Sequence, residues 1–313
     1  MGRPPRPFPR PSSPGGRVGR DRRNRMTRPT SILKTIFKRR EATIFPGAAN
    51  GLFARIIEDI GYEAVYVTGA GVANMYLGAP DIGLTTLTEI AAHVSAIADA
   101  VALPLLVDAD TGFGNPVNMV RTMKVLERAG AAGLQIEDQV FPKKCGHFDG
   151  KQVVPLEEML AKIKAAVDSR RDGDLQIVAR TDARAILGLQ AAIDRAGAMI
   201  EAGADVTFVE APVSAEELAQ IARALAVPQV ANIVFGGLTP ELGQQQFAEL
   251  GFGCVLYANA ALQAALKASH DVLTALKREG SLASVADRLA GFDIRQQTVA
   301  KPKYDELERR YRQ

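Results

Sequence analysis

One repeated unit limits what this chain can fold into. From Thr43 onward, a short run of β-branched and other apolar residues is followed by a polar or glycine-rich turn and then by an alanine-rich segment with apolar residues three and four positions apart. The runs are TIFPGAA at 43–49, AVYVTGA at 64–70, PLLVDAD at 104–110, GLQIEDQ at 133–139, QIVARTD at 176–182, DVTFVEA at 205–211, PQVANIV at 228–234 and CVLYANA at 254–260. Strands alternating with helices predict a parallel sheet covered by helices. Eight such units, and no GxGxxG after the first run, favour an α/β fold of the (β/α)8 TIM-barrel type over an open dinucleotide-binding sheet.

Composition and charge limit the class of protein further. Of the 313 residues, 47% are hydrophobic and 23% are charged, which is typical of a soluble globular protein. No apolar run reaches the roughly 18 residues of a membrane span, so we expect no membrane partner. Two cysteines give no disulfide framework and fit a reducing compartment, and we expect a cytoplasmic protein.

The net charge of +3 conceals an uneven distribution. Residues 1–25 contain eight Arg, one Asp and six Pro, so the rest of the chain is mildly acidic. This stretch has too few apolar residues to offset the entropy lost on ordering. A nucleic-acid-binding arm and an organelle presequence are alternatives, but we expect a disordered extension over 1–26 and no nucleic-acid partner. Residues 27–313 are then a single α/β-barrel catalytic domain with C-terminal helices.

Polar groups end the predicted strands from the second to the eighth. Active sites of barrels of this type lie at the C-terminal ends of the strands, so these groups are the candidates for a site. They are Thr68, Asp108, Asp110, Glu137, Asp138, Arg180, Asp182, Glu210, Asn232 and Asn259.

The acidic members of this set indicate a metal site. Alternation along a strand places Asp108 and Asp110 on one face, and Glu137 ends the next strand. Oxygen ligands without histidine suit Mg²⁺, with Mn²⁺ as the alternative. Solvated loop aspartates or helix caps are the plainer interpretation. Arg180 either neutralises these carboxylates or binds an anionic substrate, and the N–H groups of VTGAGVA at 67–73 could bind an anion.

The segment KKCGH follows the fourth predicted strand and contains Cys145 and His147. A structural zinc site is excluded because no CxxC occurs and Cys254 starts the eighth predicted strand. A thiol beside lysines and a histidine can act as a general acid or base, or as a covalent nucleophile, and a bystander is the third alternative. Cys254 reads as a core thiol, and His93 and His270 as packing or surface residues on helices.

Six motifs in this order carry a family resemblance: YVTGAGVA, LGAPDIG, DADTGFGN, IEDQVFPKKCGH, ARTDA and ANIVFGGLTP. Together they resemble the isocitrate lyase and phosphoenolpyruvate mutase superfamily, and most of all its short carbon–carbon lyases. The resemblance covers about residues 27–290. It implies an α/β barrel that binds Mg²⁺, assembled as a homotetramer in which subunits exchange the eighth barrel helix.

The resemblance also assigns roles to residues. Asp110 would bind the metal directly, Asp108 and Glu137 through water, and Asp81 of APDIG would complete the acidic shell. The substrate would be held by Thr68, Gly69, Ala70, Arg180, Glu210 and Asn232. Tyr66 would be the base, and Cys145, positioned by His147, would protonate the departing enolate.

The activity implied is Mg²⁺-dependent cleavage of a 2-hydroxy dicarboxylic acid, by retro-aldol or retro-Claisen chemistry, to a 2-oxo acid and a carboxylic acid. The loop CGHFDGK departs from the methylisocitrate-lyase pattern, which favours a two-carboxylate substrate such as a 2-alkylmalate. Two alternatives stay open. One is an oxaloacetate hydrolase of the same superfamily, and the other is an inactive barrel with a basic interaction tail.

Overall fold

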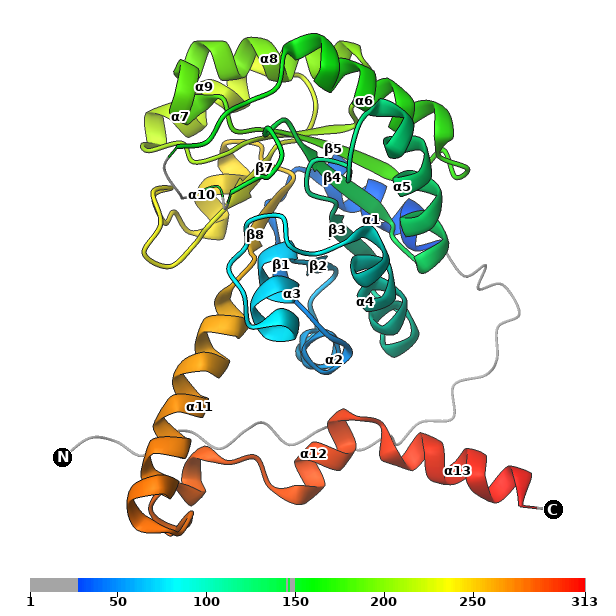
Figure 1. Cartoon of the computed structure of the whole chain (residues 1–313), viewed down its shortest axis with the longest axis vertical. Coiled ribbons are helices and arrows are strands. Elements are labelled where there is room, and N and C mark those ends of the chain that lie inside the picture. Colours follow the sequence, from blue (N-terminus) through cyan, green and yellow to red (C-terminus); the bar gives the residue numbers. More distant parts are fainter. Residues whose placement is uncertain (1–27, 145, 147–149, 313) are drawn as a thin grey trace.

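A computed structural model describes residues 28–144, 146 and 150–312. Eight parallel strands form its centre, and helices surround them (Figure 1). The strands are β1 (Thr43–Ala48), β2 (Val65–Val67), β3 (Leu105–Asp108), β4 (Gly133–Glu137), β5 (Gln176–Thr181), β6 (Val206–Val209), β7 (Val230–Asn232) and β8 (Cys254–Tyr257). All eight coincide with the predicted runs, so the (β/α)8 prediction is confirmed.

The strands close into a barrel in an order that follows the chain. Hydrogen-bonded neighbours run β6-β5-β4-β3-β2-β1-β8-β7. A parallel bridge between Thr207 and Gln229 joins β6 to β7 and completes the circle. The Thr207 hydroxyl also donates to Gln229 Oε1 at 2.8 Å, inside the barrel wall. Closure places all eight C-terminal strand ends around one mouth.

The helices follow the alternating pattern of the sequence. Those before the fifth strand are α1 (Pro29–Arg39), α2 (Gly51–Ile60), α3 (Gly69–Val72), the π-helix η1 (Ala73–Leu77), α4 (Leu87–Ala100), α5 (Pro116–Ala129) and α6 (Leu156–Ser169). Those after it are α7 (Arg184–Leu187), α8 (Leu189–Glu201), α9 (Ala215–Ala224), α10 (Gln244–Glu249), α11 (Ala260–Glu279), the 3-10 helix η2 (Ala283–Arg288), α12 (Phe292–Thr298) and α13 (Lys301–Tyr311).

The predicted strands extend too far at their C-terminal ends. β2 stops at Val67 and β3 at Asp108, so Thr68 and Asp110 lie in the loops beyond. Thr68 instead begins α3, and its hydroxyl accepts a hydrogen bond from the Gly71 N–H at 3.2 Å. The expectation that strand alternation places Asp108 and Asp110 on one face was therefore wrong, because Asp110 is not in the strand.

Helix α1, which the repeat did not predict, covers one end of the barrel interior. Leu33, Ile36 and Phe37 are buried in one cluster with barrel residues that include Phe45 and Leu106. The Leu33 side chain packs so closely on β4 that a Cβ at position 133 would lie 2.8 Å from it. This packing leaves only the opposite end of the barrel for a site.

The last helices leave the barrel. Figure 1 shows α11 (orange) running away from the strands and α12 and α13 continuing as an arm. Of the 20 residues of α11 only Ala275 is buried, and Leu266 and Leu273 are more than 60% exposed. Within the residues described, no helix has both the length and the apolar character that crossing a bilayer requires.

We predict that Leu33→Ala lowers the free energy of unfolding by about 2–5 kcal/mol, because it leaves a cavity at a fully buried site. The matched control is Leu187→Ala, which removes the same atoms from a side chain that is 55% exposed, and a change within about 0.5 kcal/mol is expected. Urea denaturation measures both. Equal effects would show that α1 does not seal the barrel.

Candidate active site

The polar groups at the strand ends surround a small cavity at the mouth of the barrel. Its lining comprises Tyr66, Thr68, Ala70, Asp81, Asp108, Lys143, Gly146, Arg180, Glu210, Asn232, Val234, Ala258 and Asn259. The cavity volume of about 40 Å³ holds only a few water molecules. Two of the lining residues, Lys143 and Gly146, come from the loop after β4 and lie over the mouth.

One side of the cavity is acidic. Asp108, Asp110 and Glu137 are all more than 90% buried, and the Lys143 ammonium lies among them. Lys143 Nζ is 2.9 Å from Asp110 Oδ1 and also hydrogen-bonds Asp81. A lysine thus occupies the position between carboxylates where the sequence predicted a metal ion.

Asp110 reaches this position through an unusual backbone conformation. Its φ of 45° is in the left-handed region, which non-glycine residues rarely adopt, although aspartate does so more often than most. Its N–H donates to Asp108 Oδ1 at 3.1 Å, and its carbonyl accepts from the Glu137 N–H at 2.9 Å. Such strain, about 1–3 kcal/mol, persists where the surrounding structure over-determines it, commonly at functional sites.

Burial disfavours the ionised form of two of these carboxylates, Asp110 and Glu137, and so raises their pKa values. Burial is the largest cause that raises the pKa of Asp110 to about 6, with Asp108 and Asp81 adding to it against the opposing effect of Lys143. Burial likewise raises the pKa of Glu137 well above its usual value, although Arg180 and Lys143 act against it. Lys143 shows the reverse balance: burial opposes its charge, but Asp110, Glu137 and Asp81 outweigh burial and raise its pKa.

The donor set fits a hard divalent cation. Every acidic group here offers carboxylate oxygens, and no described histidine joins them. Glu137 Oε1 is buried and has no hydrogen-bond partner among the described residues, which leaves it available to a cation. In the described part of the chain, however, no three acidic, histidine or cysteine groups already surround one point as metal ligands do. A cation would therefore have to displace Lys143 and draw the carboxylates together.

The other side of the cavity is built on Arg180, at the end of β5. Its Nε and Nη2 donate to the two oxygens of Asp182 at 2.9 and 3.1 Å, a bidentate contact that fixes the guanidinium plane. The remaining N–H groups face Glu137 Oε2 at 3.4 Å and Glu210 Oε2 at 3.5 Å. Burial acts to lower the pKa of Arg180, but Asp182, Glu210 and Glu137 outweigh it and raise the pKa further.

The turn Thr68-Gly69-Ala70 lies at the cavity, next to the acidic residues Asp108 and Asp110. A Cβ at position 69 would be 3.0 Å from Asp108 Oδ2 and 3.4 Å from Asp110 Oδ1, so only glycine lets the backbone approach these carboxylates so closely. Ala70 lines the cavity from within α3, where any L-residue adopts the backbone conformation. The alanine therefore causes no strain.

Tyr66 is buried below this turn and hydrogen-bonds Asp108. Burial, followed by the charge of Asp108, raises the pKa of Tyr66 well above its usual value. In this arrangement the phenol keeps its proton, so Tyr66 is a hydrogen-bond donor here. Its expected role as a base stays a prediction.

The loop after β4 is tied down at its base. Gln139 and Val153 form an antiparallel bridge, and the Gln139 amide exchanges two hydrogen bonds with the Lys144 backbone, at 2.8 and 2.9 Å. A Cβ at Gly146 would lie 2.5 Å from Arg180 Nη2 and 2.7 Å from Glu210 Cδ, so the Gly146 backbone rests directly on that pair. The predicted acid Cys145 and its neighbour His147 lie outside the described residues.

The structure brings most of the predicted site residues to the mouth, together with two lysines to which the sequence assigned no role in the site. Arg180, Glu210, Asn232, Thr68 and the four acidic residues assigned to the metal all lie at the mouth, either in the cavity lining or in contact with it. Lys143 and Lys151 flank the predicted thiol, and the sequence predicted for them no role beyond that of basic neighbours. The available signal was their position in a loop that directly follows a strand end.

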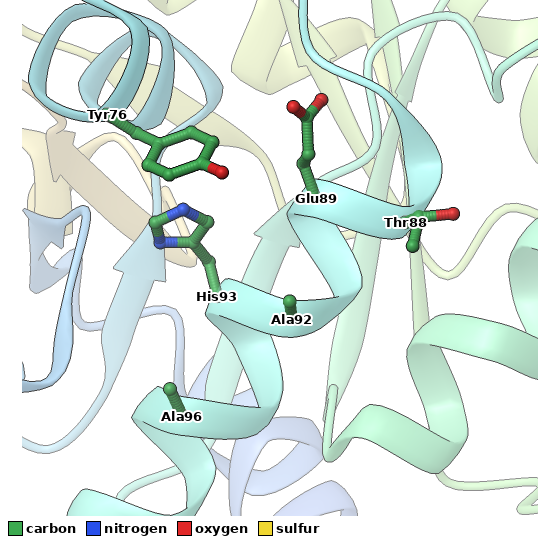
Figure 2. Close-up of a pocket in the computed structure, with 6 residues that line it drawn as sticks. All are labelled: Tyr76, Thr88, Glu89, Ala92, His93 and Ala96. Carbon is green, nitrogen blue, oxygen red and sulfur yellow. The ribbon is translucent and has the colours of Figure 1, made fainter.

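The other candidates lie away from the mouth, as predicted. Figure 2 shows a shallow groove on α4, where Tyr76 stands edge-on to His93 with ring centroids 5.0 Å apart. His93 Nδ1 is 3.0 Å from the Ala49 carbonyl, so the ring ties α4 to the loop after β1. Cys254 is fully buried in the barrel, and burial raises the pKa of its thiol. The side chain of His270 is 78% exposed.

Comparisons with known proteins identify the family. The profile of the phosphoenolpyruvate phosphomutase family matches residues 33–277. The chain is 42% identical to 2,3-dimethylmalate lyase of Eubacterium barkeri over 279 residues, 89% of this chain and 96% of that protein. It is 44% identical to 2-methylisocitrate lyase of Aeropyrum pernix over 267 residues, 85% of this chain and 86% of that one.

Solved structures agree. A crystal structure of 2,3-dimethylmalate lyase, described as a PEP mutase/isocitrate lyase superfamily member, superposes with a TM-score of 0.86 at 32% identity and covers 91% of this chain and 96% of its own. An oxaloacetate acetylhydrolase in complex with 3,3-difluorooxalacetate gives a TM-score of 0.84 at 32% identity, with 90% and 98% covered.

The chain therefore belongs to the phosphoenolpyruvate mutase/isocitrate lyase superfamily. It is an enzyme of the carbon–carbon lyase type.

We predict a pH dependence of stability in the ion-free protein. The pKa of Asp110 rises from 3.8 to about 6, so the folded state binds its proton more tightly than the unfolded chain does. Stability from this group is therefore present below pH 3.8 and is lost as pH rises towards about 6. Asp110→Asn should flatten this part of the profile, measured by urea denaturation in EDTA. An unchanged slope would contradict the buried-carboxyl assignment.

We also predict that Gly146→Ala lowers kcat/KM by about 100-fold, because its Cβ cannot coexist with the present positions of Arg180 and Glu210. Gly197→Ala is the matched control. It lies within α8 with nothing within 4 Å of the added Cβ, and it should stabilise the protein by about 0.5–1 kcal/mol without altering turnover. Wild-type turnover in Gly146→Ala would show that the loop does not rest on this pair during catalysis.

Proposed function

We propose that this enzyme cleaves a 2-hydroxy dicarboxylic acid of the 2-alkylmalate or methylisocitrate type, in the presence of Mg²⁺, to a 2-oxo acid and a carboxylic acid. The observation that carries the proposal is the division of the mouth into two sides. Asp108, Asp110 and Glu137 offer oxygen ligands to a cation, and Arg180 faces the same cavity with its guanidinium plane fixed. A small molecule with a hydroxyl and two carboxylates suits such a cavity.

Mg²⁺ bound by Asp108, Asp110, Glu137 and Asp81 would polarise the hydroxyl and carboxylate of the substrate. Arg180 would bind a carboxylate through the N–H groups that Asp182 leaves free, and the N–H groups of Gly69 and Ala70 would orient the substrate from the opposite wall. Tyr66, deprotonated beside the bound cation, would take the proton of the hydroxyl, and the adjacent carbon–carbon bond would then break. Its electron pair passes to the carbon next to the second carboxylate and forms an enolate.

Cys145 would protonate that enolate, since it adjoins Gly146, which lies over Arg180 and Glu210. His147 would position the thiol. Glu210 and Asn232, on the β6–β7 side, would contact the carboxylic-acid half of the substrate. Exclusion of water by the loop would prevent protonation at the wrong atom.

The named relatives support this class of substrate and leave its identity as part of the proposal. They include 2,3-dimethylmalate lyase and 2-methylisocitrate lyase. Cleavage of oxaloacetate is the second candidate, favoured by the structural match to oxaloacetate acetylhydrolase. In hydrated form, oxaloacetate presents the same adjacent hydroxyl and carboxylate.

We further propose a homotetramer in which α11 packs against a second subunit. Within this subunit α11 buries only Ala275 and exposes Leu266 and Leu273. Exposed leucines on a helix that leaves its own barrel suit burial against another copy.

The decisive experiment incubates the protein with Mg²⁺ and a panel of 2-alkylmalates, 2-methylisocitrate and oxaloacetate. The products are detected by NADH-coupled reduction of the 2-oxo acid and by NMR. We expect a 2-oxo acid from a 2-alkylmalate and no reaction in EDTA. No product from any of these substrates, with or without Mg²⁺, would contradict the proposal.

For the acid, we predict that Cys145→Ser retains substrate binding but lowers kcat by about 100-fold or more, since a hydroxyl is a far weaker acid than a thiol. The matched control is Cys254→Ser, at the buried thiol away from the mouth, which should alter stability more than kcat. Turnover retained in Cys145→Ser would assign the proton to another group.

A further inference from the structure

A buried lysine under the loop has no role in the chemistry described so far. Lys151 is 7% exposed, and its ammonium lies 2.8 Å from Asp182 Oδ1, while Asp182 itself is completely buried. The same ammonium donates to the Gly146 carbonyl. Burying an ammonium costs several kcal/mol unless its partners compensate. If position 151 served only to pack the loop against the barrel, an apolar residue would stabilise the protein more.

The partner that Lys151 holds is the one that orients Arg180. Asp182 Oδ1 accepts from Lys151 Nζ and also from Arg180 Nη2, at 3.1 Å, and Oδ2 accepts from Arg180 Nε. The backbone N–H of Asp182 donates to Asp138 Oδ1 at 2.9 Å, and this hydrogen bond fixes the main chain at Asp182. Lys151 therefore restrains the remaining freedom of the Asp182 side chain.

Sharing Asp182 between two cations also changes what Arg180 offers. A carboxylate paired with Arg180 alone would neutralise it, whereas here Lys151 supplies part of the compensating charge. The N–H groups of Arg180 that Asp182 does not bind face Glu137 and Glu210, at 3.4 and 3.5 Å. These distances exceed those of strong charge-assisted hydrogen bonds, which leaves the cavity side of the guanidinium available to an anion.

The second contact of Lys151, with the Gly146 carbonyl, also acts on Arg180. The Gly146 carbonyl accepts from Lys151, and the Cα of Gly146 lies so close to Arg180 that a Cβ would be 2.5 Å from Nη2. One ammonium thus fixes both the carboxylate behind Arg180 and the backbone in front of it.

We infer that Lys151 is a positioning residue for carboxylate binding, acting through Asp182 on Arg180 and through the Gly146 carbonyl on the backbone that covers it. The inference rests on the proposed function for the identity of the substrate carboxylate. It adds a residue that does not touch that substrate.

The test compares Lys151→Met with a matched control, Lys162→Met. Lys162 is 3% exposed and is also paired with a carboxylate, Glu158 at 3.1 Å, but it lies on α6 outside the mouth. The probe is oxalate, titrated calorimetrically into each full-length variant in saturating Mg²⁺. We expect Lys151→Met to raise the Kd of oxalate at least tenfold, Lys151→Arg to recover most of the loss, and Lys162→Met to leave the Kd within twofold.

A double-mutant cycle with Asp182→Asn separates positioning from general stability. If Lys151 acts through Asp182, Lys151→Met should weaken oxalate binding by less than about threefold in the Asp182→Asn background. Full additivity of the two losses, or an unchanged Kd in Lys151→Met, would overturn the inference. Should Lys151→Met fail to fold, Lys151→Gln serves the same comparison.

Kinetics distinguish this inference from the proposed function. With a cleaved substrate, we expect a larger rise in KM than fall in kcat for Lys151→Met; a fall in kcat alone would contradict positioning of the binding arginine. If the wild type cleaves no substrate of the panel but binds oxalate, and Lys151→Met weakens that binding, the proposed function fails while the role of Lys151 stands.

Discussion

The organisation of this site depends on an excess of buried negative charge on one side of the barrel mouth. Asp81, Asp108, Asp110 and Glu137 converge on the mouth of a barrel where water is scarce, and Lys143 lies among them. Burial raises the pKa of Asp110 to about 6 even with this ammonium beside it. Such a cluster is stable in the charged form only when a cation is present, whether it is the lysine or a divalent metal ion. Binding of a divalent metal ion here would therefore be coupled to the position of the loop, because Lys143 belongs to the loop.

The fold supplies the geometry that makes the cluster possible. Closure of β6 onto β7 brings the strand ends together, and α1 fills the opposite end of the barrel. Two local features then refine the mouth: the left-handed backbone at Asp110 and the missing side chain at Gly69. The basic side of the site is held by a second, separate network, in which Asp182 connects Arg180 to Lys151. The site is thus two buried ion clusters that face one small cavity.

The sequence predicted the barrel because its signal is periodic and local. Each run of β-branched residues was followed by an amphipathic helix, and all eight strands formed where predicted. The predicted strands ended too late in the sequence. Thr68 and Asp110 directly continue the apolar runs, but in the structure they lie beyond the hydrogen-bonded strands β2 and β3. Asp108, Asp110 and Glu137 could be predicted from their positions at or just beyond the ends of strands, whereas Asp81, which follows η1, came only from the family resemblance. The pairing of Lys151 with Asp182, 31 positions away, could not, because it depends on how the loop folds back.

The most direct test of the divided site is calorimetric binding of oxalate to the wild-type protein at increasing Mg²⁺ concentration. If the acidic side binds the cation and the Arg180 side binds the anion in one cavity, each ligand must raise the affinity for the other. We predict that oxalate binds at least 100-fold more tightly in saturating Mg²⁺ than in EDTA. Equal affinity under both conditions would contradict the account, since the two sides would not then form one site.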